Sequence, residues 1–179
     1  MNCNFGRCRR QHRWPVTIDL KRDELLYDIK NMAYVEGENM QDASDEMKSR
    51  VQDVCDEGNI DRVNRMLDMA YAECVEMLFA YTKMGIEPIT WQNNEPKCKC
   101  CNVYSIEMQM PETMSQTTVT LLRNCVHDYM VDYVLSDWLS INYAAAAAKW
   151  TLRCVETKEK IMEAVNMRVV PVRRTQRPF

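Results

Sequence analysis

The pentapeptide Lys-Cys-Lys-Cys-Cys, residues 97–101, comes closest in composition to a metal or redox site. Its thiols belong to Cys98, Cys100 and Cys101. A structural zinc site usually takes its ligands in pairs separated by two residues, and that spacing is missing here. The nearest further ligands, Cys3, Cys8 and His12, lie far upstream, so a composite zinc site is the less favoured alternative. We expect no metal or cofactor and interpret the pentapeptide as a loop tip.

Catalytic patterns have less support. His127 stands beside Asp128, but no serine or cysteine nucleophile follows at a recognisable spacing. The chain has no GxxxxGK[ST], GxGxxG or HExxH motif, and its four glycines leave little material for a phosphate-binding loop. We interpret His127 as a polar residue of a helix interface and expect no enzymatic activity.

Charge is distributed unevenly along the 179 residues, although the net charge is only −3. Residues 1–22 carry +5, residues 168–179 carry +4, and the body between them carries 13 bases against 25 acids. Two basic arms therefore flank an acidic body. Such arms bind nucleic acid or acidic protein surfaces. The N-terminal candidates for this contact are Arg7, Arg9, Arg10 and Arg13.

Most of the chain that must position these residues shows the periodicity of helices. Apolar residues recur at helical spacing within residues 23–37, 44–58, 60–85, 115–139 and 142–165. Residues 86–110 instead alternate apolar and polar side chains on both sides of the cysteine cluster, which predicts a β-hairpin with a long tip.

The predicted fold is mainly α: a multi-helix bundle of about five helices with one projecting β-hairpin and extended N- and C-terminal arms. The bundle forms a single domain over residues 23–168, between a basic arm at 1–22 and a second basic arm at 169–179. No apolar stretch is long enough for a membrane span, and the N-terminus lacks the apolar region of a secretion signal. We therefore expect no membrane partner and reduced thiols.

Five consecutive alanines, residues 144–148, precede the last helical stripe. Alanine favours helix and lets another backbone approach closely. Tight packing inside the subunit is the more ordinary interpretation, and a contact between subunits is the alternative.

The order of elements resembles that of the head-to-tail connector, or neck ring, proteins of tailed bacteriophages. RDELLYDIKNMAYVEG, MQMPETM, HDYMVDYVLSDWLSIN and RRTQRPF are similar to segments of the crAss-like phage proteins of this kind. The resemblance covers about residues 20–179 and leaves residues 1–18 without a counterpart.

This resemblance implies a virion protein that forms a ring of roughly a dozen copies below the portal. In that family the C-terminal arm reaches up to clamp the portal protein. Here the corresponding residues are Arg168, Arg173, Arg174, Arg177 and Phe179. The ring would contact further neck or tail proteins and let DNA pass without sequence-specific binding.

The leading hypothesis is accordingly a structural neck protein made in the bacterial host cytoplasm. The alternative is a small helical nucleic-acid-binding or regulatory protein that uses its basic N-terminal arm. The acidic body favours the first hypothesis, because it would repel phosphates over most of the surface.

Overall fold

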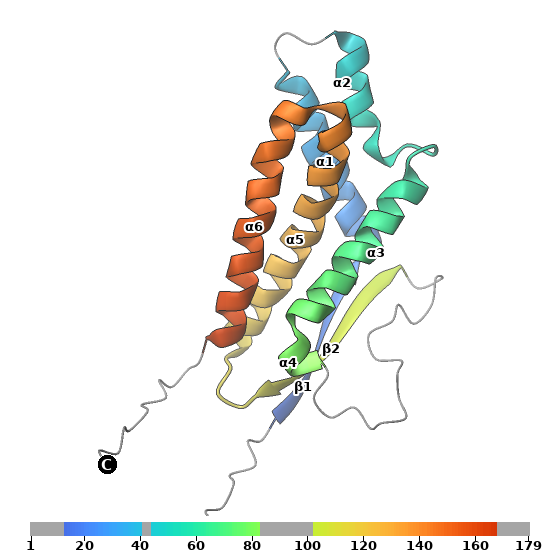
Figure 1. The fold of residues 1–179 in the computed structure, drawn as a ribbon. Coiled ribbons are helices and arrows are strands. Elements are labelled where there is room, and N and C mark those ends of the chain that lie inside the picture. Colours follow the sequence, from blue (N-terminus) through green and yellow to red (C-terminus); the bar gives the residue numbers. More distant parts are fainter. Residues whose placement is uncertain (1–12, 41–43, 83–101, 168–179) are drawn as a thin grey trace, which may run out of the picture.

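The computed structural model describes residues 13–40, 44–82 and 102–167, which form a helical bundle with one two-stranded sheet (Figure 1). The predicted mainly α fold class is confirmed. In chain order the elements are β1 (Arg13–Lys21), α1 (Arg22–Glu38), α2 (Asp45–Gln52), the 3-10 helix η1 (Asp53–Cys55), α3 (Ile60–Met77), α4 (Phe79–Thr82), β2 (Val103–Pro111), α5 (Gln116–Asn142) and α6 (Ala144–Asn166). None of the helices in these ranges combines the length and apolarity needed to cross a membrane.

Helix α5 is the centre of the bundle, since it packs against α6, α3 and α1. Its start is fixed by Ser115, whose hydroxyl accepts a hydrogen bond from the Thr118 backbone N–H at 3.1 Å. Near its other end, the buried Trp138 donates its Nε1–H to the Val51 carbonyl at 3.0 Å. This bond fastens the end of α2 to α5.

Helix α6 follows α5 after a break at Tyr143 and folds back along it (Figure 1). Trp150 and Ile161 are buried against the bundle. Asn142, at the start of the predicted 142–165 helix, instead is the last residue of α5 and donates its side-chain N–H to the Trp138 carbonyl at 3.1 Å. Of the five alanines, Ala146 and Ala147 are buried, whereas the other three are exposed.

The sheet pairs β1 with β2 in an antiparallel register that places Ile18 opposite Ile106 and Leu20 opposite Tyr104. Alternate residues of β2 are buried and the intervening ones are less so, as a half-buried strand requires. The sheet contacts α1, α4 and α5. It therefore closes one side of the core.

The position of β1 corrects the predicted extent of the N-terminal arm. Residues 13–21 form the strand that pairs with β2, and Arg22 is the first residue of α1. The alternation of Val16, Ile18 and Leu20 with polar neighbours is a strand pattern. The high arginine content of residues 1–22 led instead to the prediction of a basic arm there. Residues 86–101, the first part of the predicted hairpin, lie outside the described residues.

Two helix ends also differ from the sequence pattern. α3 stops at Met77, and Leu78 separates it from α4. Gly37 does not end α1 but lies inside it and is buried. A Cβ at Gly37 would lie 2.8 Å from Cγ of Gln52. Gly37 therefore permits the close approach of α1 to the end of α2.

Candidate interaction surfaces and polar sites

Most of the predicted arm residues lie outside the described part of the chain. This holds for Arg7, Arg9 and Arg10 at the N-terminus and for Arg168, Arg173, Arg174, Arg177 and Phe179 at the C-terminus. Arg13 is described, and it is the first residue of β1, opposite Pro111. It is partly buried and has a partner of its own, so it is not a residue of a free arm.

Both basic terminal segments join the bundle at the same end. Figure 1 shows the start of β1 and the end of α6 at the end where α4 lies, with α2 at the opposite end. Residues 1–12 hold three arginines and no acid, and residues 168–179 hold four arginines and no acid. Residues 13–167 hold the remaining 16 bases against all 26 acids, a net charge of −10. The chain thus carries a charge of +7 in two segments that attach to one end of an acidic body.

Three large apolar side chains are exposed at the same end, which we call the docking end. Trp14 of β1 is 58% exposed, Phe79 of α4 is 57% exposed, and Met167, just after α6, is 46% exposed. Aromatic residues beside arginines are typical of protein interfaces, where the aromatic ring supplies contact area and the guanidinium binds carboxylates. The docking end therefore has the composition of a protein contact.

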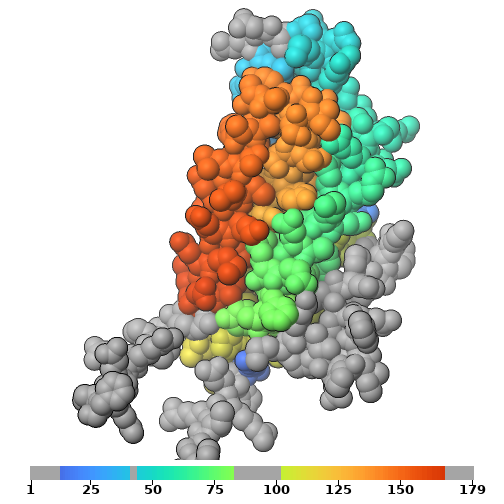
Figure 2. Space-filling view, viewed as in Figure 1, coloured from blue at the N-terminus to red at the C-terminus, as the bar shows by residue number. Residues whose placement is uncertain are grey.

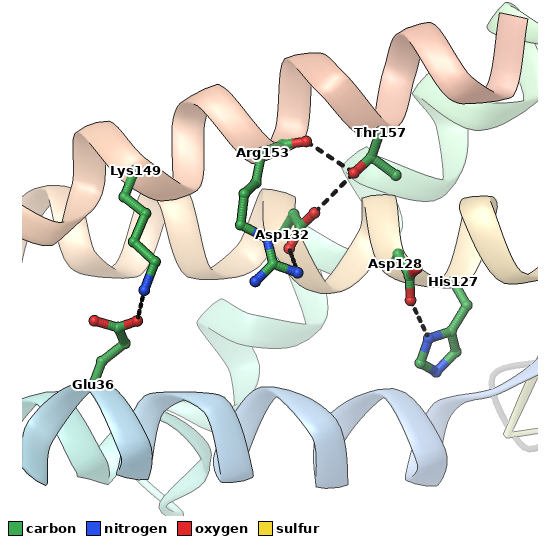
Figure 3. A network of polar contacts seen from close by, with 7 residues as sticks. All are labelled: Glu36, His127, Asp128, Asp132, Lys149, Arg153 and Thr157. Carbon is green, nitrogen blue, oxygen red and sulfur yellow. Dashed lines mark hydrogen bonds and ion pairs between the residues drawn. The ribbon is translucent and has the colours of Figure 1, made fainter. Parts of the chain in front are cut away.

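A polar network ties α6 to its neighbours (Figure 3). Asp132 of α5 is buried, and its Oδ1 lies 3.3 Å from a guanidinium nitrogen of Arg153. The Thr157 hydroxyl lies 3.0 Å from Asp132 Oδ2 and 2.8 Å from the Arg153 carbonyl, so it donates to one of the two at a time. Burial raises the pKa of Asp132, while Arg153 and Thr157 act in the opposite direction. The network is structural, because it holds one charge inside the helix contact.

The second contact in this network joins α6 to α1. Lys149 Nζ lies 2.5 Å from Oε1 of Glu36, whose side chain is only 9% exposed (Figure 3). The lysine side chain itself is 58% exposed. Lys149 therefore reaches from the surface to neutralise a buried carboxylate.

His127 occupies a shallow cleft between α1 and α5. Its Nε2 lies 3.4 Å from Asp28 Oδ2, and its Nδ1 lies 3.7 Å from Asp128 Oδ1. Leu20, Glu24 and Arg123 contribute to the same cleft. The predicted interface role fits this place between two helices. Within residues 13–40, 44–82 and 102–167, no group of three or more histidine, cysteine or acidic side chains is arranged to hold a metal.

The described cysteines are free thiols in apolar surroundings. Cys74 and Cys125 are buried, and Cys55 and Cys154 are partly buried. Burial raises the pKa of all four thiols, which keeps them protonated and poorly nucleophilic. The prediction that they serve as small packing residues fits this environment. The cluster of Cys98, Cys100 and Cys101 lies outside the described residues, as do Cys3, Cys8 and His12.

Sequence patterns missed two hydrogen-bonded contacts that fix α3. The Tyr129 hydroxyl donates to Glu73 Oε2 at 2.5 Å. The Tyr104 hydroxyl lies 2.7 Å from Asp68 Oδ1 and also accepts a hydrogen bond from Arg22. The sequence offered one signal, which is that these tyrosines stand on apolar faces where a buried hydroxyl requires a partner.

Comparison with known proteins found no match for this chain among family models, curated proteins or solved structures.

Proposed function

We propose that this chain is a structural subunit of a bacteriophage neck that docks on the portal through its docking end. One observation carries the proposal: both basic terminal segments join an acidic body at a single end. An acidic portal surface would attract this end and repel the rest of the subunit, which sets the orientation of docking. The resemblance of residues 20–179 to neck ring proteins supports the same function.

The exposed side chains at the docking end give the contact its proposed anchors. Trp14 and Phe79 supply apolar area. From the C-terminal arm, Phe179 would add a further aromatic anchor, and Arg173, Arg174 and Arg177 would bind carboxylates of the partner. Roughly a dozen subunits, each oriented in this way, would form a closed ring around the DNA channel. The net charge of −10 on residues 13–167 would let DNA slide past without sticking.

The test is co-purification with the portal protein encoded in the same genome. Deletion of residues 169–179 is expected to leave a folded chain that no longer joins the portal. The matched control is Arg50→Ala, since Arg50 lies on α2 at the opposite end and pairs with the exposed Glu46. Retained binding by the deletion variant, or equal loss in the control, contradicts the proposed docking end.

The attachment of both arginine-rich segments to one end also suits the second candidate function, nucleic-acid binding. In that case the isolated chain binds DNA with an affinity that falls steeply with salt, and replacement of Arg7, Arg9 and Arg10 by alanine abolishes binding. Arg13→Ala is tested separately, because Arg13 belongs to β1. DNA binding in physiological salt combined with no portal binding would favour this function over the neck role.

A further inference from the structure

Helix α6 carries an exposed stripe on the side that faces away from α5. The residues of this outer stripe are Ala145, Ala148, Leu152, Val155, Glu159 and Met162, and all six are exposed. They are spaced alternately by three and four residues, which is the spacing of a helix that pairs with another helix. Leu152 is 60% exposed, Val155 49% and Met162 44%. In Figure 2, α6 forms one flank of the molecule along its length.

From this stripe we infer that the free chain forms a two-fold dimer in which the outer stripes of two copies pair in antiparallel orientation. Two-fold contacts are self-complementary, so each residue of the stripe must suit its counterpart on the second copy. The inference concerns the chain before it meets any partner. It does not rest on the proposed neck function.

Side-chain size is the first argument for this orientation. The small residues stand at the start of the stripe and the large ones at its end. Antiparallel pairing places Ala145 against Met162, Ala148 against Glu159 and Leu152 against Val155, so that each layer joins a smaller and a larger side chain. Parallel pairing would place alanine against alanine and leave gaps, which packed interfaces avoid.

Charge beside the stripe is the second argument. Lys149 and Glu156 flank the stripe on the same side, seven residues apart. In the antiparallel register Lys149 of one copy lies about 3 Å along the axis from Glu156 of the other. Its ammonium, which binds Glu36 of its own subunit, has further N–H donors for this contact, and the two-fold axis repeats the pair. A parallel pair would place Lys149 opposite Ala144 of the other copy, because opposite flanks of the stripe face each other in parallel pairs, so this contact would be lost. The antiparallel register therefore suits both the sizes of the side chains in the stripe and the charges beside it.

The size of the stripe limits the strength of the dimer. From Ala145 to Met162 the helix extends ~27 Å, with a diameter of ~10 Å. A contact of this size buries less than the ~800 Å² per partner of a standard interface. We therefore expect a dimer that dissociates when the protein is diluted.

Analytical ultracentrifugation of the full chain in reducing buffer tests the dimer. The wild-type chain is expected to change from dimer to monomer on dilution, whereas Leu152→Glu and Val155→Lys are each expected to stay monomeric at the concentration where the wild type is dimeric. Both side chains are exposed, so the fold should be retained, and circular dichroism checks this. Met69→Glu is the matched control, because Met69 is 58% exposed on α3. It should dimerise like the wild type.

Mixing the two monomeric variants tests the register. In the antiparallel dimer the new glutamate at position 152 meets the new lysine at position 155, and the other central layer keeps its valine and leucine. The equimolar mixture should therefore dimerise although neither variant does so alone. A monomeric wild-type chain at all concentrations, undisturbed dimers in both single variants, or a mixture that stays monomeric would each overturn the inference. Portal binding is measured separately, so failure here leaves the docking end untouched.

Discussion

The Asp132 carboxylate of α5 and the Arg153 guanidinium of α6 lie 3.3 Å apart, with the aspartate side chain 2% exposed and the arginine 44% exposed. The arginine also lies over the Trp150 ring, 4.5 Å from its centroid. A buried acid is thus neutralised by a base that is still partly hydrated. This arrangement makes the contact between α5 and α6 sensitive to both charge and pH.

Arg153→Met is expected to destabilise the fold at neutral pH and to do so less in acid. The substitution leaves a buried carboxylate without its cation, at a cost of about 1–3 kcal/mol in the free energy of unfolding. The lower part of this range is expected because water partly screens Arg153. Urea unfolding at several pH values measures the difference.

The sign of the pH dependence follows from the raised pKa of Asp132. Since burial raises this pKa in the folded protein, the folded state holds the proton more tightly than the unfolded chain. The free-energy cost of burying the ionised Asp132 carboxylate is therefore absent below the unfolded pKa of ~3.9 and complete above the raised folded pKa. Loss of Arg153 removes a charge that lowers the folded pKa, so the variant should recover stability as the pH falls. Asp132→Asn in the same variant should abolish this recovery.

Arg62→Met is the matched control for that experiment. Arg62 also pairs with an acid and lies over a tryptophan, but its partner Asp137 is 49% exposed. Exposed ion pairs contribute only ~0–1 kcal/mol. Equal losses for the two variants, or a loss in Arg153→Met that is the same at every pH, would contradict the burial argument.

Tyr129→Phe is expected to lower the free energy of unfolding by about 1–3 kcal/mol, because a hydrogen bond to a charged group is lost. The Tyr129 hydroxyl donates to Glu73 and links α5 to α3. Tyr133→Phe serves as the control, since Tyr133 is less buried and its ring packs at a tilt against Tyr129, with the centroids 6.1 Å apart. Denaturant unfolding compares the two variants, and a larger loss for Tyr133→Phe would contradict the assignment.

The sheet gives a prediction about the true boundary of the N-terminal arm. Deletion of residues 1–12 should leave the fold intact, whereas Ile18→Ala should cost about 2–5 kcal/mol, because Ile18 is 1% exposed and packs in the core. Thr17→Ala, on the exposed face of the same strand, should cost far less. Equal stability of the Ile18 and Thr17 variants would mean that β1 does not close the core.

How much of this structure could be predicted from the sequence depends on the range of each interaction. The helices were predictable, since side chains such as Val63, Leu67 and Cys74 recur at local spacings. The pairing of β1 with β2 was not, because no local pattern specifies a partner so far along the chain. Asp132 was missed for a related reason: a charged residue within an apolar stripe suggests exposure until its partner on another helix is known.

The docking end likewise combines a feature that the sequence predicts with one that only the tertiary structure shows. The basic composition of both termini was evident from the sequence, and their binding to a partner stays a prediction. That the two segments leave from one end depends on the directions of β1 and α6, which tertiary packing sets. Arg13 was misplaced because a charge count does not distinguish a strand from a free arm.

The buried thiols provide the last prediction, on chemical reactivity. In the folded chain at about pH 8, Cys74 should react with iodoacetamide far more slowly than it does in urea, because alkylation requires the thiolate and burial both hides the sulfur and raises its pKa. Cys154 should be less protected, since it is only partly buried. Peptide mapping by mass spectrometry follows each site separately, which keeps Cys98, Cys100 and Cys101 out of the comparison. Equal labelling of Cys74 in the folded and unfolded chain would mean that α3 opens readily, contrary to its packing against α5.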